Sequence, residues 1–181
     1  MRVVFISLAA VLACGCGRGG EVEEKPDSLA LQAQDALFGE VPESDAVVVS
    51  IIDKAGACEA VQARAMLKDA TSLTLVFSKP PGGELQPGSY EVWQPMTGLP
   101  TSDLVVADLT RTDDACANTL TALERVPVQG SVTLETIRLE DDGQVTGSYD
   151  ILFGGGRLTG SFVASKCGIP ELIEQTDAGC R

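Results

Sequence analysis

The strongest constraint on the fold is a strand pattern that occurs twice near the end of the chain. Residues 144–149 read QVTGSY and residues 157–162 read RLTGSF, and each copy follows a turn rich in Asp or Gly. Alternate residues of each copy share one face at a period of two. These residues are Val145, Gly147, Tyr149, Ile151 and Phe153 in the first copy, and Leu158, Gly160, Phe162 and Ala164 in the second. The pattern predicts a half-buried antiparallel hairpin, which is a scaffold and carries no chemistry of its own.

Short strand patterns separated by turn signals fill most of the chain after residue 45. β-Branched or alternating runs predict further strands at residues 46–52, 71–78, 87–93, 103–110 and from 130 onward. Apolar residues at helical spacing predict one helix within 55–70, and residues 111–120 read as a long polar loop. The sequence therefore predicts a mainly β domain over residues 46–181. We expect an antiparallel β-sandwich or a partly closed barrel of about seven strands with one short helix.

The strand before the hairpin changes its apolar face part-way along. Val132 and Leu134 lie on one face, whereas Ile137 has the opposite parity. This change of parity predicts a bulge near Glu135 or Thr136.

The first residues have the features of an export signal. Residues 3–13 are apolar apart from Ser7, follow Arg2 and are too few to cross a bilayer, which needs about 20 apolar residues. Residues 11–14 read VLAC and resemble the lipobox of bacterial lipoproteins, in which a lipidated cysteine becomes the first residue of the mature chain. The resemblance implies a signal peptide over residues 1–13 and lipidation of Cys14, with Cys16 as the alternative.

A lipid anchor would hold the protein at a membrane without a spanning helix. The resemblance further implies the outer membrane of a Gram-negative envelope, because the residue after the lipidated cysteine is not Asp. Residues 14–45 carry Gly, Pro and a surplus of acids, and we predict a flexible acidic tether there. A short helical face within the tether is possible at Leu29, Ala33, Ala36 and Leu37.

Composition excludes several classes of function. The chain has no histidine, which rules out Ser-His-Asp and Cys-His catalysis and any zinc site that uses histidine. Lys and Arg number 13 against 26 Asp and Glu, a balance that argues against nucleic-acid binding. We expect no cofactor, because the match of Gly15, Gly17 and Gly20 to a dinucleotide-binding motif lies between the leader and the tether.

Four cysteines remain in the predicted domain: Cys58, Cys116, Cys167 and Cys180. Exported thiols usually pair, so we expect two disulfides, and we favour Cys58 with Cys116 and Cys167 with Cys180 among the three connectivities. Zinc is disfavoured because no two of the four lie close enough to form a C-x-x-C pair. We expect no metal site.

Three further groups of residues could carry chemistry. The acidic stretch 140–143 could bind calcium, although a hairpin turn needs the same residues. Paired carboxylates for glycoside hydrolysis could come from Glu91, Asp103 or Asp150. Tyr90 and Trp93 could form a platform for a sugar or a peptide, or could simply pack.

Taken together, the lipobox-like leader, the acidic spacer and the doubled hairpin that ends at Cys167 resemble small predicted lipoproteins of uncharacterised function, as found in myxobacteria. The resemblance implies a location and a scaffold. We expect a membrane-anchored, non-catalytic binding or structural module of the cell envelope, whose partner is an envelope protein or a glycan. The alternatives are a carboxylate-dependent carbohydrate-active enzyme, and a periplasmic inhibitor or assembly factor that inserts the loop 111–120 into its partner.

Overall fold

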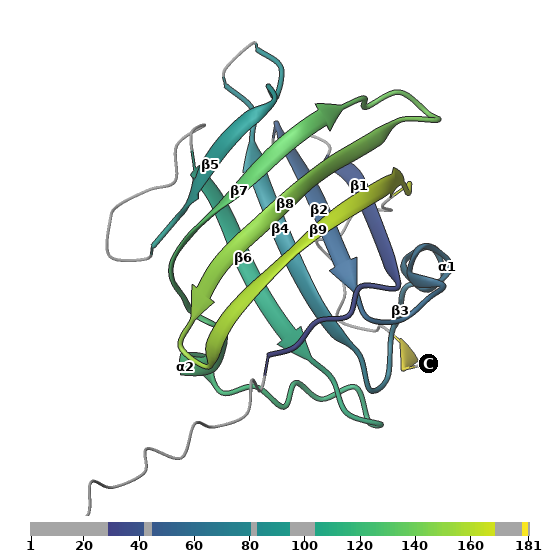
Figure 1. Cartoon of the computed structure of the whole chain (residues 1–181). Helices are drawn as coiled ribbons and strands as arrows, with labels where there is room; N and C mark the ends of the chain where they lie inside the picture. The colour runs from purple at the N-terminus through teal and green to yellow at the C-terminus, as the bar shows by residue number, and fades with distance from the viewer. Residues whose placement is uncertain (1–28, 42–44, 81–82, 95–103, 169–178, 181) are drawn as a thin grey trace, which may run out of the picture.

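Eight strands close into a barrel (Figure 1). The computed structural model describes residues 29–41, 45–80, 83–94, 104–168 and 179–180, so the predicted signal peptide, Cys14 and Cys16 lie outside the described residues. In order around the barrel, the strands are β1 (Asp35–Val41), β2 (Ala46–Ile52), β4 (Thr71–Ser78), β6 (Leu104–Arg111), β5 (Gly88–Val92), β7 (Pro127–Ile137), β8 (Gln144–Phe153) and β9 (Gly156–Lys166). The prediction of a mainly β, barrel-like domain is confirmed.

Strand β1 lies in the stretch that we predicted to be tether. It pairs with β2 over its whole length and closes the barrel against β9 through Leu37 and Phe38. The predicted boundary at residue 45 is therefore wrong, and so is the short helical face. The reason is that three consecutive residues of β1, Leu37, Phe38 and Gly39, are buried, so the strand lacks the alternation that would mark it.

The sheet is mixed, whereas we expected it to be antiparallel. β5 runs parallel to β6 at Glu91 and Val92, and β1 runs parallel to β9 at the closure. Each parallel joint has only two residue pairs, and every other joint is antiparallel. These two short parallel pairings are therefore the weakest strand pairings in the barrel.

Inward-facing side chains occupy the barrel interior. The largest that are fully buried are Phe38, Phe77, Phe153, Leu29, Ile51, Leu73, Leu75, Leu109, Leu134, Ile151, Val47 and Val49. An eight-stranded barrel has an interior just wide enough for side chains to fill. Leu29 and Leu85 join this core from opposite ends of the barrel, because Leu29 lies against the β8–β9 turn and Leu85 lies beside the end of β7.

The doubled sequence forms the predicted hairpin, and the pairing explains why it is doubled. Antiparallel register sets Gly147 opposite Phe162 and Tyr149 opposite Gly160. A Cβ at Gly147 would lie 3.0 Å from the Phe162 ring, and a Cβ at Gly160 would lie 2.5 Å from the Tyr149 hydroxyl. The Phe162 ring therefore covers Gly147, which is buried, whereas the Tyr149 hydroxyl lies against Gly160, which stays exposed. The predicted bulge is also confirmed, since the register of β7 shifts between Leu134 and Thr136.

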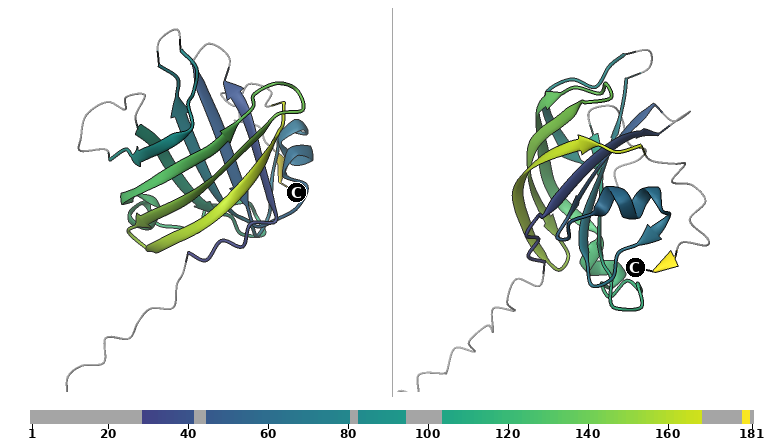
Figure 2. Two further views of the ribbon diagram at one scale, coloured as in Figure 1. Left: turned by 45° about the horizontal axis from the view of Figure 1, so that its top comes forward. Right: turned by 90° about the vertical axis from the view of Figure 1, so that its right-hand side faces the viewer.

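A small appendage covers the outside of the barrel beside β1 and β2 (Figure 2). It consists of α1 (Ala57–Gln62), β3 (Ala65–Met66) and β10 (Gly179–Cys180), with β10 pairing in parallel with β3. The helix predicted within 55–70 is present but short. It begins after Gly56, which has a left-handed φ of 81°, and it ends before Arg64, whose φ of 51° is also left-handed.

Two disulfides fasten the appendage to the barrel, in a connectivity that differs from the predicted one. Cys58 bonds Cys167 and Cys116 bonds Cys180, with Cα atoms 5.7 and 5.8 Å apart. Because β9 closes against β1, its end reaches α1, and Cys167 packs in a cluster with Leu37 and Ala57. Strand order thus decides the pairing, and sequence spacing alone does not reveal it.

The close packing around Gly147 gives a first prediction. Gly147→Ala would put a Cβ 2.3 Å from the carbonyl oxygen of Thr133, a backbone atom that cannot move aside. We expect the free energy of unfolding to fall by about 1–3 kcal/mol in urea denaturation. Gly168→Ala is the control, because a Cβ there meets nothing within 4 Å. Equal stabilities for the two variants would contradict the packing described here.

The disulfides give a second prediction. Replacing both Cys58 and Cys167 by serine removes a disulfide that spans 109 residues and joins α1 to the barrel. We expect a loss of about 2–5 kcal/mol in the free energy of unfolding. The same change at Cys116 and Cys180 should cost less, because β10 is held to β3 by only two surface residue pairs and can detach without opening the barrel. A larger loss of stability on removing Cys116–Cys180 would show that the barrel depends on the attachment of β10, which contradicts this description.

Candidate functional site

The barrel wall has a gap in its strand pairing beyond Val92, the last residue of β5, and we call this gap the seam. β5 has 5 residues, whereas its neighbours β6 and β7 have 8 and 11. β5 pairs with β6 only at Leu104 and Val105, and with β7 only from Ser131 to Leu134. Beyond Val92, β6 and β7 both continue, and within the described residues no strand pairs with them in the space between.

A groove of about 300 Å³ occupies this seam on the outer face of the barrel. Its lining comes from the end of β5, from β6, from α2 (Ala122–Arg125) and from the start of β7. The lining residues are Trp93, Val106, Ala107, Asp108, Ala122, Arg125, Val126 and Pro127. Most of these side chains are apolar, and the volume lies at the lower end of ligand sites, which span roughly 300–1,000 Å³.

One ion pair bridges the seam. Arg125 donates from Nη2 to both carboxylate oxygens of Asp108 at 2.8 and 2.9 Å, and its Nε donates to Oδ1 at 3.2 Å. Both side chains are partly exposed, 36% and 45%, so the pair adds little to stability. Its effect is to neutralise the two charged groups that line the groove.

Local sequence places Arg125 at this point. Thr121 caps α2, accepting a hydrogen bond from the Glu124 amide while the Glu124 carboxylate accepts one from the Thr121 amide. Gly154 lets the helix lie close to the β8–β9 turn, because a Cβ there would lie 2.0 Å from the Leu123 carbonyl oxygen. Arg125 is the last residue of α2, and its guanidinium reaches Asp108 on β6.

The edge of β6 presents backbone groups to the seam. The Trp93 amide donates to the Val105 carbonyl oxygen at 2.8 Å, and the Thr119 amide donates to that of Arg111 at 2.7 Å. Both carbonyls point away from β4, and the direction alternates along a strand. The N–H and C=O groups of Ala107 and Leu109 therefore also point away from β4, and both residues are buried, at 5% and 0% exposed.

Exposed apolar side chains gather beside the groove. Five large hydrophobic residues are exposed among the described residues, and three of them are Leu123 (81%), Val126 (40%) and Val128 (48%). These three fall in the short segment of α2 and β7 that bounds the seam. A concentration of this kind is typical of an interaction surface.

The two predicted aromatic site residues have different roles. Tyr90 is 8% exposed, donates to the Gln86 carbonyl oxygen and packs edge-on against Phe77, so it belongs to the core. Trp93, three residues further along, lies just past the end of β5 and lines the groove. Sequence reasoning missed Asp108 and Arg125. The Thr-Ala-Leu-Glu capping motif at residues 121–124 was the one signal that could have located α2.

Two of the predicted carboxylates line a second, polar hollow. Glu91 and Asp150 flank Ser131 there, and Asp103 lies outside the described residues. Strand β7 lies between β5 and β8, so the two carboxylates are two strand spacings apart, or roughly 9–10 Å. Arg157 donates to both oxygens of Asp150, and this hydrogen bonding holds the pKa of the Asp150 carboxyl below its usual range. Both Glu91 and Asp150 are at the solvent-facing surface.

The acidic stretch 140–143 forms a turn. The Gly143 amide donates to the Glu140 carbonyl oxygen at 2.8 Å, and a Cβ on Gly143 would lie 2.1 Å from the Arg138 carbonyl oxygen. Lys166 reaches the turn and donates to the Leu139 carbonyl oxygen at 2.6 Å. Conformation accounts for these residues, and among the described residues no group of three or more acidic or thiol side chains is arranged to hold a metal ion.

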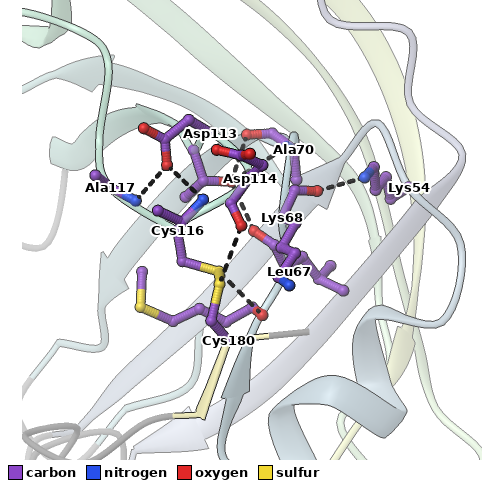
Figure 3. Close-up of a disulfide and its surroundings, with 12 residues drawn as sticks. Lys54, Leu67, Lys68, Ala70, Asp113, Asp114, Cys116, Ala117 and Cys180 are labelled. Carbon is purple, nitrogen blue, oxygen red and sulfur yellow. Dashed lines mark hydrogen bonds between the residues drawn. A yellow bond between two sulfur atoms is a disulfide. The ribbon is translucent and has the colours of Figure 1, made fainter.

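The loop between β6 and α2 is folded back on itself (Figure 3). Asp113 accepts hydrogen bonds from the amides of Ala115 and Ala117 at 2.9 and 2.8 Å. Cys116 follows with a left-handed φ of 60° and is bonded to Cys180. The loop is therefore braced by its own hydrogen bonds and by the disulfide to Cys180.

No protein-family model, curated protein or solved structure matches this chain. In the part that the structure describes, no helix is long and apolar enough to cross a membrane.

The ion pair across the seam gives a third prediction. Asp108→Asn should weaken the bidentate pair, let Arg125 swing away and admit water to the groove. Trp93 is the only tryptophan in the chain, so we expect its fluorescence to shift to longer wavelength, with a loss of stability of about 1 kcal/mol or less. Asp150→Asn is the control, because it weakens a similar pair with Arg157 outside the groove. An equal shift in both variants would contradict the role of Arg125 as the bridge.

Proposed function

We propose that the protein is an exported, lipid-anchored and non-catalytic binding module of the cell envelope, and that its binding surface is the Trp93 groove. The observation that carries this proposal is the pair of disulfides, Cys58–Cys167 and Cys116–Cys180. Disulfides that join distant parts of a small domain persist in oxidising compartments. They support export, and the lipobox-like leader then supports a cysteine anchor.

A binding role is favoured by where the surface features lie. The barrel interior is taken up by packed side chains, so a ligand must bind to the outside. On the outside, the seam brings together a partly buried Trp93, an apolar lining and the exposed residues Leu123, Val126 and Val128. Aromatic and aliphatic side chains in a groove with few charges are the usual composition of a binding site.

A carboxylate-dependent carbohydrate-active enzyme is the second candidate. It is favoured by Glu91 and Asp150 sharing one hollow at a separation of roughly 9–10 Å, near the range of inverting glycosidases. Against it, a glycosidase keeps its acid in a buried setting that raises the pKa, and neither carboxylate of this hollow is buried. The binding role is therefore the better supported of the two.

Metabolic labelling tests the anchor. The full chain, expressed in a Gram-negative host fed an alkyne fatty acid, should become labelled and partition into membranes. Cys14→Ser should abolish labelling, and Cys16→Ser, the matched control, should retain it. Labelling lost only in Cys16→Ser would move the anchor to that residue, and an unlabelled wild-type chain would overturn the proposed anchoring.

A further inference from the structure

We propose that the end of the barrel at α2 rests on the lipid surface that carries the anchor, with Leu123 inserted among the lipids. The inference rests on the proposed lipid anchor, and it names a bilayer as the partner of the exposed apolar residues beside the groove. Its basis is that these residues lie where the chain from the anchored cysteine enters the barrel.

The β8–β9 turn brings the entry of the chain and α2 together. The described part of the chain starts, in purple, at the same end of the barrel as α2 (Figure 1). A Cβ at Gly155 in this turn would lie 3.3 Å from the Leu29 side chain and 3.2 Å from that of Glu124. Leu123 directly precedes Glu124 in α2, so it belongs to the same end of the barrel.

The length of chain between the anchor and the barrel favours this end as the one that faces the lipid. Only residues 15–28 separate Cys14 from Leu29. The predicted flexible tether would span about 20 Å over this length. Strands β7 and β9, with 11 residues each, are roughly 35 Å long. The α2 end is therefore held near the bilayer, and the opposite end stands away from it.

The two ends differ in their exposed side chains. Charged residues line the hollow around Leu85 at the opposite end: Glu40, Lys79, Glu84, Arg138 and Glu140. At the α2 end, residues 154–156 of the turn are glycines, and Leu123 is 81% exposed. A large apolar side chain at this exposure favours contact with lipid, whereas the charged end favours water.

The charged residues of α2 do not oppose the contact. Arg125 is paired with Asp108, and the Glu124 carboxylate accepts a hydrogen bond from the Thr121 amide. Two acids of the β6–α2 loop, Asp113 and Asp114, lie instead on the side of the appendage, near Cys180 (Figure 3). The barrel therefore meets the lipid with its α2 side.

The charge of the chain indicates the class of lipid. With 13 Lys and Arg against 26 Asp and Glu, the protein is repelled by an anionic surface. Attraction has to come from burial of apolar surface, and burial of Leu123 favours the docked state by roughly tenfold. A contribution of this size orients an anchored protein but does not hold a free one. The partner is thus a zwitterionic bilayer that already carries the anchor.

Quenching of tryptophan fluorescence by brominated lipid tests the orientation. The lipidated chain is reconstituted in phosphatidylcholine vesicles that carry bromine on their acyl chains. Trp93→Phe removes the only tryptophan, and Leu123→Trp or Val163→Trp then supplies a single reporter. Val163 is the matched control, since it is 59% exposed and pairs with Thr146 near the opposite end of the barrel. We expect quenching to be roughly threefold or more stronger at position 123.

A second reporter tests whether Leu123 drives the contact. On the Trp93→Phe background, Val128→Trp replaces a neighbouring side chain that is 48% exposed. Adding Leu123→Glu should remove most of the quenching at position 128, because the docked population falls by roughly tenfold. Adding Val163→Glu instead should leave the quenching unchanged. All these side chains are exposed, so the barrel core is the same in every variant.

Three results would overturn the inference. Equal quenching at positions 123 and 163 would mean that the barrel has no fixed orientation on the lipid. No quenching at positions 123 and 128 would leave these residues to a protein partner. Quenching at position 128 that survives Leu123→Glu would mean that Leu123 does not drive the contact. The measurement uses only chains that carry the fatty acid, so failure of docking stays separable from failure of the anchor, which appears as absent labelling.

Discussion

The short length of β5 is the constraint on which the rest of the wall depends. A strand of 5 residues between strands of 8 and 11 cannot seal the barrel along its whole height. The chain closes the upper part of the wall with a two-pair parallel joint to β6 and leaves the lower part to side chains. Arg125, placed by the capping box of α2 and the close approach at Gly154, spans the remaining opening to Asp108. The groove thus follows from the topology and from no single residue.

Because side chains fill the barrel interior, a ligand has to bind on the outside of the barrel. Aromatic and aliphatic residues fill the eight-stranded interior, and Leu29 and Leu85 join the core from opposite ends. The glycine–aromatic exchange between Gly147 and Phe162, and between Gly160 and Tyr149, keeps this core dense without large side chains at every position. With the interior occupied, ligand sites have to lie on the outside, where the seam and the polar hollow at Asp150 are two of several hollows among the described residues.

Local patterns in the sequence predicted the elements that depend on local rules. Strands β2 and β4 are rich in β-branched residues or alternate cleanly, and the bulge at Leu134 was marked by a change of parity. β1 was missed because the barrel buries Phe38 from inside and the appendage buries Leu37 from outside, which removes the alternation. The disulfide partners and the Arg125–Asp108 pair depend on strand order. That order is set by pairing between residues far apart in sequence, and periodicity does not encode it.

Amide exchange at the edge of β6 tests the central claim most directly. In the free protein the Val106 and Asp108 amides point to β4 and should exchange slowly, whereas the Ala107 amide points into the seam and should exchange faster. If the Ala107 amide is protected as strongly as the Val106 and Asp108 amides, the wall is closed beyond β5 and the account of the seam is wrong.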